Sequence, residues 1–208
     1  MNFSSVIKLS IVLVVAFSGI EALRVRHADH KLQAYAGAGA VFPAGDGPVQ
    51  GSPVGKSFEF RGYQVKPLAS FAVRARVLAR EDYHLGREAD LSPVDLALGW
   101  KRMADPQVYE PLNITQGGRW YRYSWRDQPP IPVQEIIESS ANMHMIPATP
   151  AVERTLKQAK AGRYVRMTGQ LVQVTHASGW KWTSSLTRSD SGAGSCEVIF
   201  VEAIELER

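Results

Sequence analysis

The feature that most constrains this chain is a segment rich in glycine, proline and alanine at residues 34–55. Such a composition buries too little apolar surface to offset the entropy lost on ordering. We therefore predict a flexible linker over residues 23–56 and one folded domain over residues 57–208, a length typical of a single domain. A glycine-rich phosphate loop is not expected, because it would need a strand before it and a helix after it.

The first residues of the chain predict export. Lys8 is the only charge before an apolar run at residues 9–20, which is shorter than the ~20 residues of a membrane-spanning helix. We interpret residues 1–22 as a signal peptide and expect a periplasmic or secreted protein. The alternative is an inner-membrane protein that keeps residues 1–22 as its anchor. Positive charges that oppose translocation follow the run, at Arg24, Arg26 and Lys31.

Composition narrows the class of partner. Hydrophobic residues make up 45% of the chain and charged residues 21%, as in ordinary globular domains, so the domain can bury a core. The formal net charge is +4, but lysine and arginine do not cluster, so nucleic acid is not an expected partner.

The single cysteine, Cys196, excludes an internal disulfide, and its apolar neighbours favour a buried position in a strand.

The spacing of apolar residues predicts an α+β domain with a mostly antiparallel sheet and two or three short helices. Apolar residues alternate over residues 71–78, as in a half-buried strand. In a second strand, residues 164–175, the alternation shifts next to Gly169, which predicts a bulge or bend that lets the strand join two sheets. A third strand, residues 197–204, is apolar on both faces. The C-terminal half also suggests a small OB-like partial barrel, although such a barrel needs about five strands.

Two dipeptides, Ser-Pro and Thr-Pro, predict helices in which the hydroxyl residue is the N-cap and proline takes the first helical position. The first helix would begin at Ser92 and continue over residues 94–103. The second would begin at Thr149 and run to about Ala161. Prolines also precede residues 133–139, where they predict a third, short helix.

Three sequence blocks carry a resemblance. They read LSPVDLALGW at residues 91–100, SANMHMIP at residues 140–147 and GWKWTSSLTRSDSGAGSCE at residues 179–197. These blocks resemble the hallmark blocks of a family of uncharacterised exported bacterial proteins. The resemblance implies a protein of the bacterial cell envelope and brings no known activity with it.

Met143, His144 and Met145 form the first candidate site. Thioether and imidazole groups are ligands that suit copper, especially the reduced ion. In a strand, however, Met143 and Met145 point to one face and His144 to the other, so the three do not converge on one ion. We therefore predict neither a metal nor a cofactor, and we expect both methionines to pack in the core.

A thiol enzyme is the second candidate. Cys196 would be the nucleophile, His144 or His176 the base, and Asp190 the carboxylate that orients the base. The residue types are present, but no local signature of a cysteine hydrolase surrounds Cys196. The sequence alone does not show that these side chains meet.

A binding surface near the C-terminus is the third candidate. Its residues are Trp180, Trp182, Ser184, Ser185, Arg188 and Asp190. The spacing of Trp180 and Trp182 predicts that they share one face of an extended segment. Indole faces stack on sugars or apolar partners, and arginine pairs with carboxylates. In the alternative, both tryptophans belong to the core and Arg188 pairs with Asp190 inside a hairpin. We favour a non-enzymatic binding or accessory module for an unknown envelope protein or glycan, and the alternative is an envelope enzyme that uses Cys196.

Overall fold

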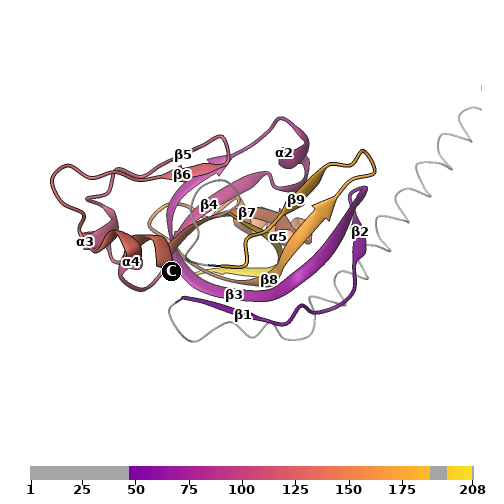
Figure 1. Ribbon diagram of the computed structural model, residues 1–208, viewed down its shortest axis with the longest axis horizontal. Helices are drawn as coiled ribbons and strands as arrows, with labels where there is room; N and C mark the ends of the chain where they lie inside the picture. The colour runs from indigo at the N-terminus through magenta and orange to yellow at the C-terminus, as the bar shows by residue number, and fades with distance from the viewer. Residues whose placement is uncertain (1–46, 188–195, 208) are drawn as a thin grey trace, which may run out of the picture. The chain divides into compact units, whose positions relative to one another are not determined.

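The computed structural model describes residues 47–187 and 196–207, which form a mixed α+β domain dominated by strands (Figure 1). The α+β prediction is confirmed. The predicted signal peptide, residues 1–22, and residues 23–46 of the predicted linker lie outside the described residues. The described strands are β1 (Gly47–Gly51), β2 (Phe58–Phe60), β3 (Tyr63–Asp82), β4 (Val94–Gly99), β5 (Thr115–Gly117), β6 (Trp120–Arg122), β7 (Ser140–Pro147), β8 (Tyr164–Thr175), β9 (Lys181–Thr183) and β10 (Glu197–Leu206). The described helices are α2 (Arg87–Leu91), the 3-10 turn η1 (Lys101–Ala104), α3 (Pro106–Tyr109), α4 (Val133–Glu138) and α5 (Pro150–Leu156).

The long strand β3 organises the sheet. One edge of β3 pairs with β8, and the other edge pairs in turn with β2, β1 and β4. Strand β4 pairs with β7, β7 with β10, and β10 with β8, so the path that leaves β3 through β4 returns to it through β8. These pairings are antiparallel except that of β7 with β10. The strands that complete the path come from upstream, so the sheet is not confined to the C-terminal half of the chain.

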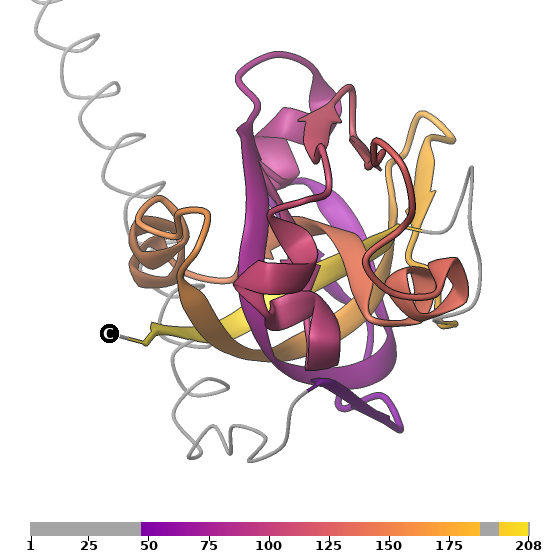
Figure 2. The same ribbon diagram turned by 90° about the vertical axis from the view of Figure 1, so that its left-hand side faces the viewer.

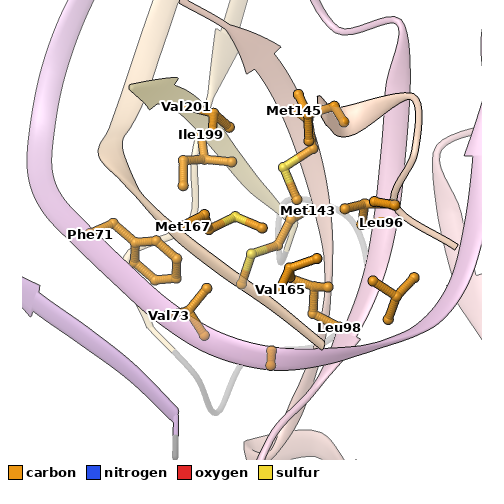
Figure 3. Packing of buried hydrophobic residues seen from close by; sticks show 14 of the residues in the cluster. Phe71, Val73, Leu96, Leu98, Met143, Met145, Val165, Met167, Ile199 and Val201 are labelled. Carbon is orange, nitrogen blue, oxygen red and sulfur yellow. The ribbon is translucent and has the colours of Figure 1, made fainter. Parts of the chain in front are cut away.

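The core lies on one face of these strands, where alternate side chains are apolar and point toward one another (Figure 3). Because successive side chains of a strand point to opposite faces, the residues between them face outward. Full burial of such a side chain contributes about 1.5–3 kcal/mol to stability. The core residues labelled in Figure 3 are Phe71, Val73, Leu96, Leu98, Met143, Met145, Val165, Met167, Ile199 and Val201.

Two of the predicted helices form where proline precedes or opens them. Helix α4 follows Pro132, and α5 begins at Pro150 with Thr149 as its N-cap, because the Thr149 hydroxyl accepts a hydrogen bond from the Val152 N–H at 3.2 Å. Helix α5 ends at Leu156, earlier than predicted, and short turns continue to Gly162. Within the described ranges, no helix is long and apolar enough to cross a membrane.

The helix predicted for residues 94–103 is wrong. Residues Val94–Gly99 form β4, which lies between β3 and β7, and the 3-10 turn η1 follows it. The run is apolar all round because β4 is buried on both faces, with Leu96 in the core and Ala97 in a second apolar cluster on the opposite side. A short apolar run of this kind fits a buried strand as well as a buried helix.

The strand predicted around Gly169 is confirmed with the same bounds, Tyr164–Thr175. It pairs with β3 on one edge and with β10 on the other, and the register with β10 shifts between Val201 and Ala203. A Cβ atom on Gly169 would lie 2.0 Å from the Phe200 carbonyl oxygen. Glycine is therefore required where the backbones of the paired strands β8 and β10 approach each other closely.

Strand β1 lies within the stretch that composition predicts to be linker. Residues Gly47–Gly51 pair with residues 70–74 of β3, so the ordered domain begins upstream of residue 57. The Gln50 side chain donates a hydrogen bond to the Leu186 carbonyl at 3.2 Å. Main-chain pairing along an edge strand needs no apolar side chains, which is why the composition gave no sign of it.

The chain between β4 and β7 adds a layer on the outer side of these two strands (Figure 2). It contains η1, α3, α4 and the β5–β6 hairpin, which is a separate two-stranded sheet. Apolar residues of this layer, including Met103 and Ile136, pack against Ala97 of β4. The layer carries Arg119, at the turn of the hairpin, toward the outer face of β4 and β7.

Candidate functional site

Five rings from three strands and one loop lie in continuous contact. The ring centroids are 4.8 Å apart for His144 and Trp182, 6.0 Å for Trp182 and Trp180, 5.8 Å for Trp180 and Tyr63, and 5.2 Å for Tyr63 and His176. We call these five residues the aromatic row. Trp180 and Trp182 lie on one face, as their spacing predicts, and both are half-buried. The row therefore presents indole surface that the core does not fully cover.

The inner end of the row is a buried ionic cluster. Asp95 is fully buried in β4, and its Oδ1 accepts a hydrogen bond from Arg119 Nη1 at 2.6 Å. Its Oδ2 lies 2.9 Å from His144 Nδ1, and the two atoms are in ionic contact without forming a hydrogen bond. A second Arg119 nitrogen, Nη2, donates to the Ser92 carbonyl at 2.9 Å. A buried carboxylate is tolerated only when paired in this way.

Arg119 connects the β5–β6 hairpin to the β3–β4 connection and to β9. Its guanidinium carbon lies 3.7 Å from the centroid of the Tyr83 ring and 5.6 Å from that of Trp182. The Arg119 backbone N–H donates to the Tyr83 hydroxyl at 2.8 Å. Burial raises the pKa of the Tyr83 phenol, so this oxygen remains a neutral hydroxyl that can accept the bond. These contacts hold the β5–β6 hairpin against the β3–β4 connection and β9.

The outer end of the row is a polar group at the surface. Arg87 Nη1 donates to the Ser178 hydroxyl at 3.0 Å, and the same hydroxyl lies 2.9 Å from His176 Nδ1. The Arg87 guanidinium carbon is 5.7 Å from the centroid of the Trp180 ring. Arg87 comes from α2 and the other three residues from the β8–β9 turn, so two connections of the fold meet here.

Ser184 and Ser185, predicted to bind a partner, are buried and hold the chain together. The Val198 N–H donates to the Ser184 hydroxyl at 3.1 Å, and the Ser185 N–H donates to the Cys196 carbonyl at 3.1 Å. The Ser184 hydroxyl in turn donates to the Ser185 carbonyl at 2.8 Å. Both residues therefore join the end of β9 to the start of β10. Arg188 and Asp190, which complete the predicted surface, lie outside the described residues.

The candidate thiol site is described in part, because Asp190 lies outside the described residues. Cys196 lies just before β10 and is partly buried, with its Sγ 4.0 Å from Asn142 Nδ2 and 3.8 Å from the Arg119 carbonyl oxygen. His144, proposed as its base, lies against Asp95, and His176 is at the far end of the aromatic row. Asp95 thus takes the position beside His144 that the sequence assigned to Asp190.

The candidate copper ligands, for which the sequence predicts no shared metal, lie on opposite faces of β7. Met143 and Met145 are fully buried in the core, whereas His144 faces outward to Asp95 and Trp182. Among residues 47–187 and 196–207, no group of three or more His, Cys, Asp or Glu side chains could hold a metal ion. The structure therefore offers no converging ligand set around His144.

Sequence reasoning missed four residues of this site: Tyr83, Arg87, Asp95 and Arg119. Asp95 gave a usable signal, because a lone carboxylate inside the apolar run LSPVDLALGW must find a partner once that run is buried. The other three gave none, since their roles depend on how distant loops meet.

Comparison of the chain with family models, with curated proteins and with solved structures gave no match. Its function must therefore be inferred from the geometry of the aromatic row.

Proposed function

We propose that this domain is a non-enzymatic binding module of the bacterial cell envelope and that its ligand, a glycan or an envelope protein, lies along the aromatic row. The observation that carries the proposal is that Trp180 and Trp182 are half-buried and held in place by the buried rings of His144 and Tyr63, with an arginine at each end of the row. The neighbouring indole rings, whose planes are inclined by 58°, offer apolar surface at little conformational cost, and arginine adds hydrogen-bond donors. Tryptophan, tyrosine and arginine are also the residue types that dominate protein interfaces.

An OB-like arrangement of the strands supports this location. We infer it from the path β3–β4–β7–β10–β8, from the parallel pairing of β7 with β10, and from α5 between β7 and β8. OB-like domains bind oligosaccharides and oligonucleotides on their second and third strands and on the loops after the first and fourth strands. In this chain those parts are β4, β7, the β3–β4 connection and the β8–β10 connection. His144, Tyr83, Arg87, Trp180 and Trp182 come from them.

Placement in the envelope rests on the sequence. The apolar run at residues 9–20 favours export, and the resemblance of the three sequence blocks to those of exported bacterial proteins agrees with it. A secreted location makes glycans and envelope proteins the available partners. The described surface around the row carries few cations, which argues against nucleic acid as the ligand.

The alternative is an envelope enzyme, which the contact between Asp95 and His144 favours. A carboxylate beside an imidazole resembles the supporting half of a nucleophile and base arrangement, and Cys196 lies just before β10, the strand that pairs with β7. Replacement of Cys196 by serine separates the two functions. A binding module keeps its ligand affinity and its cellular phenotype, whereas a thiol enzyme loses its activity.

The proposal is tested with the full chain immobilised and exposed to an envelope extract separated into glycan and protein fractions. Trp182→Ala should lose the retained ligand, because its indole links both halves of the row. The matched control is Trp125→Ala, which removes a half-buried tryptophan stacked on Tyr123, outside the row. Circular dichroism verifies that both variants fold. Equal retention by both variants would remove the row as the binding surface.

A further inference from the structure

The hydrogen bonds of His176 fix its tautomer. The Ser178 backbone N–H lies 3.1 Å from His176 Nδ1 and donates to it. A backbone N–H can only donate, so Nδ1 must carry a lone pair and the neutral ring holds its proton on Nε2. No described residue forms a hydrogen bond with Nε2. His176 therefore presents an N–H donor at the outer end of the row.

Arg87 adds further donors without a compensating charge. Its Nη1 is held by the Ser178 hydroxyl, which fixes the direction of the guanidinium. Within residues 47–187 and 196–207, no carboxylate oxygen lies within 4.0 Å of the Arg87 guanidinium. The side chain is half-buried, so this charge is partly shielded from water. Arg87 and His176 together form a cluster of donors that is suited to an anion.

The neighbouring rings indicate what carries the anion. The Arg87 guanidinium lies beside Trp180, and the Trp182 ring follows at 6.0 Å. A sugar ring stacked on the indole surface would place a carboxylate substituent within reach of the guanidinium fork. One uncompensated arginine matches a single negative charge. Nucleic acid would need several cations along its backbone, whereas the cation beside Trp180 at this end of the row is that of Arg87.

We propose that the outer end of the aromatic row, formed by Arg87, His176 and Trp180, is a subsite for a sugar ring that bears a carboxylate. This subsite deepens the proposed function and rests on it, because it needs the row to be a binding surface. The guanidinium of Arg87 and the Nε2–H of His176 donate to the carboxylate, and Trp180 and Trp182 stack on the ring and its neighbour. The ligand class is an acidic oligosaccharide.

Isothermal titration calorimetry of the full chain tests the subsite with two probes that share one sugar backbone, a short galacturonic acid oligomer and its uncharged methyl ester. The acidic oligomer should bind more tightly than the ester, and added salt should weaken only the acidic one. Arg87→Gln should weaken binding of the acidic oligomer about tenfold, as expected for loss of one charge-assisted contact, and leave the ester unchanged. The control variant Arg154→Gln removes the same charge from the exposed face of α5 and should have no effect.

The outcomes separate the subsite from the function it rests on. If both oligomers bind equally well and Arg87→Gln binds like the wild type, the acidic subsite is wrong. Loss of that binding in Trp182→Ala would then still support the aromatic row. If neither oligomer binds but a polyglutamate peptide does, in a manner that depends on Arg87, the ligand is an acidic protein segment and the sugar assignment is overturned. If none of the three probes binds, the assignment is overturned as well.

Discussion

The two ends of the aromatic row hold the same kind of side chain in opposite circumstances. At the inner end, Arg119 pairs with the fully buried Asp95, and its side chain is only 19% exposed. At the outer end, Arg87 contacts a serine hydroxyl and has no carboxylate partner among the described residues. The inner arginine is needed to compensate a charge of the fold, whereas the outer one has its charge available to a ligand.

Removal of Arg119 should have the largest effect on stability. Arg119→Met leaves Asp95 buried without its cation and removes the guanidinium from the face of the Tyr83 ring, so we expect a loss of about 3–5 kcal/mol in the free energy of unfolding. Urea denaturation measures it. The control is Arg122→Met, an exposed position on the same hairpin that should change little. Equal stability of the two variants would show that the ionic cluster does not support the fold.

A substitution at Gly169 should disrupt the pairing of β8 with β10, and with it the sheet that positions both ends of the aromatic row. Gly169→Ala places a Cβ 2.0 Å from the Phe200 carbonyl oxygen, so β8 and β10 must separate, at a cost of about 3 kcal/mol. The control is Gly117→Ala, where no atom lies within 4 Å of the added Cβ. Thermal unfolding compares the two. A Gly169→Ala protein as stable as Gly117→Ala would contradict the close approach of β8 to β10.

A second ion pair, Arg74 with Glu207, is more exposed than that of Arg119 with Asp95. The Arg74 guanidinium donates to Glu207 at 2.7 Å and, with Arg166, holds the pKa of that carboxyl below its ordinary value of 4.5. Glu207→Gln should therefore lose about 1 kcal/mol at neutral pH, since the pair is partly exposed. Because the pKa is lower in the folded state, this stabilisation is present above pH 4.5 and is lost as the pH falls through the folded-state value. Urea denaturation of the wild type and of Glu207→Gln, at neutral pH and at a pH below the folded-state pKa, measures this stabilisation. A difference in stability between the two proteins that does not change with pH would contradict the pairing.

Removal of Arg87 should have the smallest effect on stability. Because Arg87 compensates no buried charge, Arg87→Met should change the free energy of unfolding by no more than about 0.5 kcal/mol. The same urea denaturation as for Arg119→Met measures it. A loss comparable to that of Arg119→Met would mean that both ends serve the fold.

Local patterns in the sequence predict part of this molecule. The alternation that put Trp180 and Trp182 on one face, the shift next to Gly169 and the Thr149 cap all concern neighbouring residues, and the structure has each of them. The strand β4 was mistaken for a helix because burial on both faces removes the periodicity that separates the two.

The candidate site was predicted only in part, for a different physical reason. Trp180, Trp182 and His144 were named, but the charges beside them were not. Arg119 reaches Asp95 from a hairpin that follows β4, and Arg87 reaches Ser178 from another connection. Such pairs depend on the path of the sheet, which returns β8 to β3 and brings the two connections together.

The five tryptophans allow the most direct test of the aromatic row as the binding surface. Each indole N–H gives its own nuclear magnetic resonance signal, and these tryptophans lie in the row, in the core and in the outer layer. On titration of the full chain with the galacturonic acid oligomer, the signals of Trp180 and Trp182 should shift while those of Trp100 and Trp125 stay in place. Binding that moves Trp120 or Trp125 and leaves Trp180 and Trp182 unchanged would contradict the account.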